Sequence, residues 1–250
     1  MPPSRRTLLK SGLAHAILLQ AGCKGTLEPL DSVEGVDSGD AAETGVDTGV
    51  EECLASSPKS PGPFYVADSP QVSDLREDYA GSPLRLRVTL IDAATCLPLA
   101  GIPIDLWHAD VAGLYSDVDN SAVVEGLPET FGEDWFRGRQ ITDSEGVIEF
   151  LTHYPGWYPV TPPHLHFTSG FGEKQAHTWQ FYLADAFSDR VYTEVADYAD
   201  RGTHPKRTSE SGAPEDLVIT PSGEPDNAVI DVVVAVDLES LTNPPKPYGT

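Results

Sequence analysis

The segment from Tyr154 to Phe167, YPGWYPVTPPHLHF, restricts the possible fold more than any other part of the chain. Each of its four prolines fixes φ and removes a backbone donor, so the part up to Pro163 forms neither a helix nor a central strand. In the strand-like run that follows, His164 and His166 share one face because successive side chains alternate. We therefore predict a rigid loop leading into a strand whose two histidines aim at one point.

Several other short segments alternate between apolar and polar residues, as half-buried β-strands do. The clearest is LRLRVTLID at residues 84–92, whose four leading even-numbered residues are all apolar. Turn residues at 143–146 separate two strand-like runs and predict a hairpin. No segment has a convincing long amphipathic pattern. The chain is therefore predicted to be all-β, an antiparallel sandwich or barrel, with residues 116–136 as a long loop that shapes a site.

The composition limits the size of the fold and its partners. The chain has 250 residues, 40% of them hydrophobic, which suits one sizeable domain with extensions. Sixteen basic residues stand against 39 acidic ones, for a formal net charge of -23. Such a surface repels nucleic-acid phosphates and anionic lipids, so neither is an expected partner.

The N-terminal sequence MPPSRRTLLKSGLAHAILLQAGC has the layout of a cleavable export signal, with an apolar run too short to span a bilayer. Arg5 and Arg6 lie in a stretch that resembles a twin-arginine signal, and an ordinary secretory signal is the alternative. The end, LLQAGC, resembles a lipoprotein processing site with Cys23 as the lipidated residue. We predict export to the periplasm or cell surface, with membrane contact only through that lipid.

The chain is thus divided into a signal at residues 1–22, a tether at 23–52 and a folded domain at 53–250. Residues 24–52 contain nine acidic residues, one lysine and no aromatic ring, which predicts a flexible tether without a core. If Cys23 is lipidated, Cys53 and Cys96 remain as an even pair, and a disulfide is the default expectation for an exported protein. A metal-thiolate site is the weaker alternative, because no Cys or His neighbours either residue at ligand spacing.

Two tyrosines accompany the histidine pair. Tyr158 lies on the proline-rich loop, six residues before His164, and Tyr115 follows a predicted strand in WHADVAGLYS. Two neutral imidazoles and two phenolates suit a trivalent cation, with ferric iron as the natural candidate. A bound cation would also stabilise the phenolates well below their usual pKa of about 10. The alternatives are a hydrogen-bonded histidine pair and ordinary half-buried aromatic rings.

Four sequence blocks resemble those of intradiol ring-cleavage dioxygenases, the family that includes catechol and protocatechuate 3,4-dioxygenases. They are SPGPFY (60–65), DLWHADVAGLYS (105–116), RGRQITDSEGVIEF (137–150) and YPGWYPVTPPHLHF, in family order. The resemblance runs from about Cys53 to Leu183. It implies a β-sandwich with a non-haem Fe(III), held equatorially by Tyr115 and His164 and axially by Tyr158 and His166.

The resemblance also implies a reaction with O2. A catechol would bind through both oxygens and displace Tyr158, and the metal would act as Lewis acid and template. Oxygen insertion between the two hydroxyl-bearing carbons would open the ring to a muconate-type diacid. The acidic surface mildly disfavours anionic catechols.

Four further positions bear on activity. Gln180 matches a family glutamine beside the metal if one gap is allowed, with a solvent-facing strand amide as the alternative. Thr161 stands where the family usually has an arginine, and threonine supplies neither the charge nor the fork of donors. Arg137 or Arg139 would compensate, unless they are exposed strand residues that pair with nearby acids.

Two other functions are weighed against the enzyme. The first is a sandwich that binds a metal or an aromatic ligand without turnover, which Thr161 favours. The second is a zinc hydrolase that uses His164 and His166, which lacks an acidic base or third ligand at a familiar spacing. His108 is expected to pack or hydrogen-bond rather than to bind metal.

Overall fold

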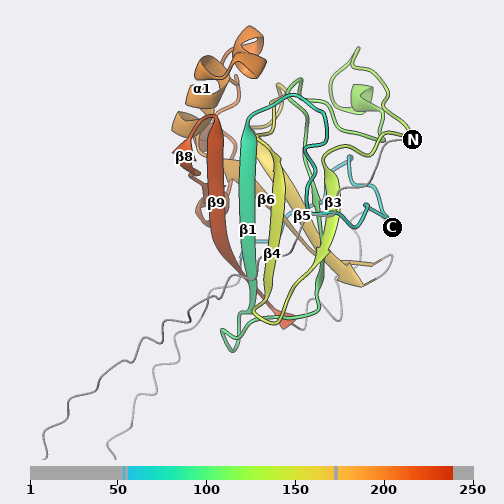
Figure 1. The fold of residues 1–250 in the computed structure, drawn as a ribbon, viewed down its shortest axis with the longest axis vertical. Helices are drawn as coiled ribbons and strands as arrows, with labels where there is room; N and C mark the ends of the chain where they lie inside the picture. Colours follow the sequence, from blue (N-terminus) through green and yellow to red (C-terminus); the bar gives the residue numbers. More distant parts are fainter. Residues whose placement is uncertain (1–52, 54–55, 172–173, 239–250) are drawn as a thin grey trace, which may run out of the picture. The chain divides into compact units, whose positions relative to one another are not determined.

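Two β-sheets form the body of the computed structural model, which describes Cys53 and residues 56–171 and 174–238 (Figure 1). The first sheet has the order β4-β1-β9-β8 and the second β3-β2-β5-β6-β7. The first contains β1 (Pro83–Asp92), β4 (Val147–His153), β8 (Ser222–Glu224) and β9 (Asn227–Val236). The second contains β2 (Pro103–Trp107), β3 (Arg137–Ile141), β5 (His164–Phe171), β6 (Lys174–Leu183) and β7 (Val218–Ile219). The predicted signal, tether and Cys23 lie outside the described residues.

Side chains from both sheets meet in one hydrophobic core, which confirms the predicted β-sandwich. The predicted alternation of β1 is present, since its even-numbered apolar residues are buried. Leu86 of β1, Phe150 of β4 and Leu165 of β5 are each 0% exposed. Full burial of such a side chain stabilises the fold by about 1.5–3 kcal/mol.

The sheets are mixed rather than purely antiparallel. β1 runs parallel to β9, with Leu86 opposite Ile230, and β6 runs parallel to β7. The remaining strand pairs are antiparallel. Strand direction depends on how distant segments dock, which the alternation of a single strand does not specify.

The predicted hairpin at residues 143–146 is wrong, although the turn itself is present. Asp143 accepts a hydrogen bond from the Gly146 amide at 3.1 Å, yet β3 and β4 belong to different sheets. The turn packs against the end of β1, where the Leu90 amide donates to Gly146 O at 2.8 Å. The chain therefore crosses from one sheet to the other at this turn.

A helical segment follows β6 and lies at one end of the sheets (Figure 1). It begins with α1 (Asp185–Glu194) and continues as the 3-10 helix η2 (Ala196–Arg201). α1 was not predicted, because its sequence has only a short apolar face, of which Phe187, Val191 and Tyr192 enter the core. Shorter 3-10 helices are η1 (Asn120–Ala122), η3 (Thr208–Glu210) and η4 (Glu215–Leu217). None of the described helices combines the length and the apolar composition that a membrane span requires.

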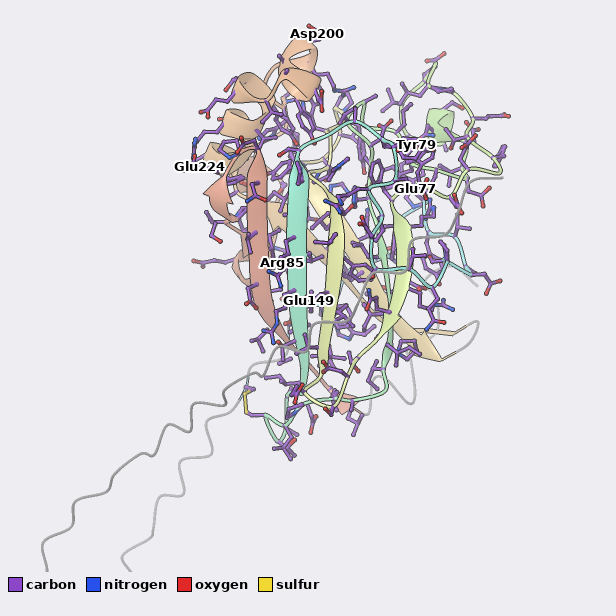
Figure 2. All side chains as sticks on the ribbon, in the orientation of Figure 1. Glu77, Tyr79, Arg85, Glu149, Asp200 and Glu224 are labelled. Carbon is purple, nitrogen blue, oxygen red and sulfur yellow. A yellow bond between two sulfur atoms is a disulfide. The ribbon has the colours of Figure 1, made fainter. Side chains whose placement is uncertain are left out.

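The exposed face of the four-stranded sheet carries ion pairs between neighbouring strands. Arg85 and Glu149 lie beside each other there, with Nη2 3.2 Å from Oε1 (Figure 2). Arg87 Nη1 lies 3.5 Å from Asp231 Oδ1. Exposed pairs of this kind each contribute up to about 1 kcal/mol.

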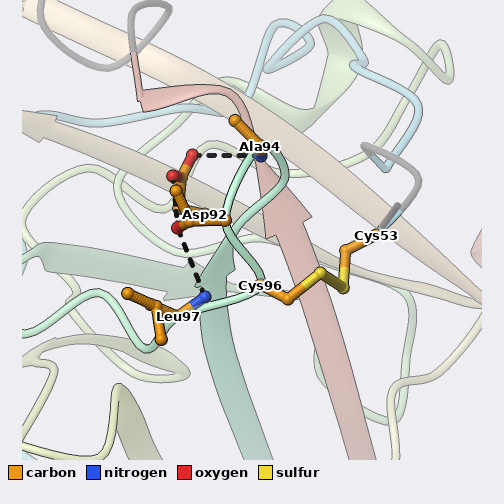
Figure 3. The surroundings of a disulfide bond; sticks show 6 residues. Cys53, Asp92, Ala94, Cys96 and Leu97 are labelled. Carbon is orange, nitrogen blue, oxygen red and sulfur yellow. Dashed lines mark hydrogen bonds between the residues drawn. A yellow bond between two sulfur atoms is a disulfide. The ribbon is translucent and has the colours of Figure 1, made fainter. Parts of the chain in front are cut away.

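Cys53 and Cys96 form a disulfide, which confirms the default expectation (Figure 3). It joins the start of the domain to the turn after β1 across a sequence separation of 43 residues. Closing a loop of that length stabilises a domain by about 4 kcal/mol in the chain-entropy model.

Candidate metal centre

Tyr115 is held by a tight loop that follows β2. The Asp110 carboxylate accepts hydrogen bonds from the amides of Ala112, at 2.9 Å, and Leu114, at 2.8 Å, which closes the loop. Asn120 then holds the backbone of Tyr115 on both sides: its Oδ1 accepts from the Tyr115 amide and its Nδ2 donates to the Tyr115 carbonyl. Tyr115 as a whole is only 1% exposed.

Tyr158 lies on the proline-rich loop, and the two histidines open β5. A bridge between Tyr158 and Thr161 narrows the loop just before the strand. His164 and His166 share one face of β5, while Leu165 between them enters the core. The local geometry predicted from the sequence is therefore present.

The structure brings the four predicted ligands together. Tyr115 Oη lies 3.0 Å from His164 Nε2, and Tyr158 Oη lies 3.4 Å from the same nitrogen. His166 Nε2 lies 2.9 Å from His164 Nε2. Four polar side-chain atoms from three separate segments thus cluster at His164 Nε2.

The protonation of these groups suits a cation. His164 Nδ1 lies 2.6 Å from Pro162 O, to which it must donate, so Nε2 carries the lone pair that faces the centre. Burial lowers the pKa of His164 to about 4 and that of His166 well below its ordinary value, so both rings are neutral near pH 7. A single lone pair on His164 accepts only one hydrogen bond, whereas three polar atoms crowd around it.

The two phenols need a positive charge to ionise. Burial raises the pKa of Tyr158 to about 12, and burial followed by the nearby Tyr158 raises the pKa of Tyr115 well above its ordinary value. Without a cation, both phenols keep their protons at neutral pH. A cation at the shared point would stabilise both phenolates and use the lone pairs of both imidazoles, so the donor set fits a hard trivalent metal ion.

Aromatic and apolar side chains enclose the centre. The Trp107 ring stacks on His166 with centroids 4.8 Å apart, and the Phe64 ring stacks on Tyr115 at 4.6 Å. Val118 belongs to the same buried cluster. Such a wall excludes water and strengthens electrostatic interactions inside.

Arg137 is buried behind Tyr115. Its Nε donates to Ser116 Oγ at 2.9 Å, and its Nη2 donates to the carbonyls of Ser116 and Phe64 at 2.6 and 3.0 Å. Its Nη1 is buried and has no hydrogen-bond partner in the described part of the chain, and burial lowers the pKa of Arg137 to about 10. Arg137 thus supports the residue next to Tyr115, and its catalytic role stays a prediction.

Arg139 and Gln180 differ in their relation to the centre. Arg139 is partly exposed and forms two hydrogen bonds with the buried Asp105 carboxylate, at 2.6 and 2.8 Å, which agrees with the ion-pairing alternative. Gln180 lies directly opposite His166 in the β5–β6 pairing and so shares its face of the sheet. Its Oε1 accepts a hydrogen bond from Tyr182 Oη at 3.1 Å.

His108 hydrogen-bonds within the fold, as expected. Its Nδ1 donates to Ala109 O at 2.8 Å, so its Nε2 accepts from Thr152 Oγ1 at 2.7 Å. Within the described ranges, no group of three or more His, Cys, Asp or Glu residues could hold a metal ion.

The sequence pattern missed the contact between the two loops that carry the tyrosines. The Gly156 amide donates to Asp110 O at 2.9 Å, and Arg201 in η2 donates to backbone carbonyls of both loops. Arg201 lies outside the four sequence blocks that resemble the family. Its hydrogen-bond partners are backbone carbonyls, and because every residue has one, the sequence does not indicate which of them Arg201 contacts. Gly113 and Gly156, which lie in two of those blocks, are the signal that could have indicated a close approach between the backbones of the two loops.

Known proteins resemble the chain in sequence. A family model described as "Dioxygenase" matches residues 61–227. A chlorocatechol 1,2-dioxygenase from Pseudomonas putida is 31% identical over 129 residues, which cover 50% of this chain and 45% of the relative. A hydroxyquinol 1,2-dioxygenase from Rhizobium sp. (strain MTP-10005) is 32% identical over 122 residues, with 42% and 40% covered. The chain spans about half the length of the curated relatives it matches.

Solved structures share the fold. An intradiol ring-cleavage dioxygenase from Tetranychus urticae aligns with a TM-score of 0.67 at 24% identity, over 76% of this chain and 98% of that structure. The crystal structure of chlorocatechol 1,2-dioxygenase from Pseudomonas putida aligns with a TM-score of 0.50 at 24% identity, over 73% and 72%. At these identities the likeness extends to the architecture alone.

Proposed function

Since this chain belongs to the intradiol ring-cleavage dioxygenases, we propose that it is a non-haem Fe(III)-dependent enzyme that opens a catechol-type ring with O2. The bond between the two hydroxyl-bearing carbons breaks, and both oxygen atoms enter a muconate-type diacid. The observation that carries the proposal is the convergence of Tyr115, Tyr158, His164 and His166 on one buried point.

Each of the four residues has a part in the proposed chemistry. When bound, the ferric ion would supply Lewis acidity and a template for the two catechol oxygens. Tyr115 and His164 are buried and anchored by hydrogen bonds, and His166 is buried and stacked on Trp107, so these three would hold the metal throughout. Tyr158 is only partly buried and has the longest contact to His164, 3.4 Å, so its side chain is the one that would turn away when the catechol arrives.

Tyr158 would also accept a proton. In the absence of a cation, burial as the largest cause raises the pKa of Tyr158 to about 12, so the phenol would be its stable form near pH 7. The departing phenolate can therefore take the proton of a catechol hydroxyl at its Oη atom. Phe64, Trp107 and Val118 would keep water from the open ring.

The experiment compares iron-loaded wild-type protein with Tyr115→Phe and, as a control, Tyr79→Phe, because Tyr79 is 40% exposed. We expect a visible phenolate-to-iron band, uptake of equal amounts of O2 and catechol, and a muconate-type product in the wild type and the control. Tyr115→Phe should lose most of its iron and the reaction. Colourless protein that contains zinc in place of iron would refute the proposal.

A binding module without turnover is the second candidate, and Thr161 is the residue that favours it. Threonine has no charge with which to stabilise a developing anion on the substrate. Coloured protein that takes up no O2 with any of a series of substituted catechols would support this candidate. The same series would identify the preferred substrate.

We also propose that the protein is exported and anchored by a lipid on Cys23. Export agrees with the disulfide between Cys53 and Cys96, because such bonds persist in oxidising compartments. Membrane fractionation and fatty-acid labelling of the full chain and of Cys23→Ser test this. Equal labelling of both proteins would contradict the anchor.

A further inference from the structure

The loops that carry Tyr115 and Tyr158 touch through their backbones. The Gly156 amide donates to Asp110 O at 2.9 Å. A Cβ atom on Gly156 would lie 2.3 Å from Asp110 O, and one on Gly113 would lie 2.2 Å from Trp157 O. No side chain fits at either position, so the two loops pass each other as closely as backbones allow.

Arg201 joins these two loops from a third segment. It is the last residue of η2, and its guanidinium donates through Nη1 to Ala112 O and through Nη2 to Trp157 O. The guanidinium also lies over the Trp157 ring, 4.5 Å from its centroid. A planar fork with fixed donor directions holds two carbonyls at a set separation, which the single ammonium of a lysine does not.

The same helical segment grips the proline-rich loop at other points. Tyr198 Oη donates to Tyr154 O at 2.6 Å, Tyr192 Oη donates to Pro155 O at 2.9 Å, and Trp157 Nε1 donates to Gly202 O at 3.1 Å. These bonds reach only one of the two loops. Arg201 is thus distinguished by bonding to both.

The charge of Arg201 is directed at these carbonyls. The Asp110 carboxylate, in the loop of Tyr115, also interacts with Arg201 electrostatically. Burial lowers the pKa of Arg201, and its Nε is buried without a hydrogen-bond partner among the residues that the structure describes. A guanidinium bound in this way fixes the positions of the backbone carbonyls around it and does not act mainly as a partner in a surface ion pair.

We propose that Arg201 is a positioning residue that fixes the separation of the loops carrying Tyr115 and Tyr158. The inference rests on the proposed function only in taking those tyrosines as metal ligands. While the Tyr158 side chain turns away and returns, Arg201 holds the backbone of the Tyr158 loop at a fixed distance from the loop of Tyr115. Loss of the fork would let the two loops separate and lower the fraction of protein with all four ligands in place.

The first test uses metal-free protein and does not depend on catalysis. Hydrogen exchange at the amides of Gly156 and Leu114, whose acceptors belong to Asp110, is compared in wild type, Arg201→Gln and Arg201→Lys. We expect exchange to be at least tenfold faster in Arg201→Gln and intermediate in Arg201→Lys. Arg207→Gln is the control, because Arg207 lies in the same region but pairs with Asp185 and Asp189 instead; it should leave both amides unchanged.

The second test uses iron-loaded protein. Arg201→Gln should release iron to a chelator at least tenfold faster and broaden the phenolate-to-iron band, whereas Arg207→Gln should match the wild type. Unchanged exchange and unchanged iron release in both Arg201 variants would overturn the proposal, and Arg201→Lys decides the matter if Arg201→Gln does not fold. If exchange is faster in Arg201→Gln than in the wild type, but neither protein binds iron or consumes O2, the positioning role of Arg201 stands and the proposed function is refuted.

Discussion

At the scale of single residues, the candidate metal centre depends on which side-chain atoms have a lone pair available to bind a cation. Pro162 O takes the Nδ1 proton of His164 and thereby directs a lone pair to the centre. Asn120 fixes the backbone of Tyr115, whereas Tyr158 has no comparable side-chain anchor among its described contacts. The two tyrosines therefore differ in freedom, although both supply the same chemical group.

This difference predicts distinct effects of removing each hydroxyl. Tyr158→Phe should retain most of its iron, shift the visible band and slow ring opening by about 10²-fold, because it loses the group that accepts the catechol proton. Metal analysis, absorption spectra and O2 uptake measure the three effects. A variant with wild-type colour and rate would remove Tyr158 from the ligand set.

His108 predicts a dependence of stability on pH. Burial lowers its pKa from 6.5 to about 4, so between these values the unfolded chain binds a proton that the folded protein excludes. The free energy of unfolding should therefore fall as the pH drops from 6.5 to 4, with a contribution from this residue of up to about 1.4 kcal/mol per pH unit.

Denaturant unfolding of wild type and His108→Gln across that range checks this contribution. The variant should show the smaller loss, because glutamine does not titrate and histidines elsewhere act equally on both proteins. Above pH 7 the difference between the two proteins should be constant. Parallel curves from pH 7 to 4 would contradict the assignment.

At the scale of elements, the turn between β3 and β4 decides the architecture. Its residues read as a hairpin, because turn residues between two alternating runs usually connect neighbouring strands. Here the turn packs on the end of β1, and the second strand pairs with β1 instead of with β3. The switch depends on Gly146, which has φ +73° and lies against Leu90 O.

Gly146→Ala should therefore destabilise the fold by more than the cost of the backbone conformation alone. Its Cβ would lie 2.4 Å from Leu90 O, whereas Gly101, with φ +75°, has open space around it. Gly101→Ala should cost about 1–2 kcal/mol, the penalty for a left-handed residue, and Gly146→Ala should cost several kcal/mol more. Thermal unfolding compares the two, and equal losses would show that packing at the turn is unimportant.

At the scale of the whole molecule, the sandwich is closed by contacts between distant segments. β1 and β9 pair although more than one hundred residues separate them, and the disulfide ties the start of the domain to the turn after β1. The centre likewise draws on three separate segments. Such an arrangement becomes stable only when the whole domain has folded.

Removal of the disulfide is therefore expected to lower global stability. Cys53→Ser together with Cys96→Ser should reduce the free energy of unfolding by about 4 kcal/mol, the loop-closure contribution for this spacing. Denaturant unfolding of the oxidised wild type, the reduced wild type and the double variant measures it. Reduction should shift the wild type to the midpoint of the variant, and three equal midpoints would refute the estimate.

Local pattern alone determined much of this protein. The alternation in residues 84–92 specified which face of β1 is buried, and the spacing of His164 and His166 placed both on one face, because strand geometry repeats every two residues. The prolines excluded a helix between Tyr154 and Pro163. The disulfide followed from the even number of cysteines left in the domain.

Only the tertiary structure decided how these pieces meet. It set the parallel pairing of β1 with β9, the crossing of the chain at Gly146 and the reach of Arg201 to two loops. Strand partners are chosen by packing over long sequence separations, which the period of a single strand does not encode. Arg201 binds backbone carbonyls. Because every residue has a backbone carbonyl, no pattern of side chains in the sequence predicts this contact.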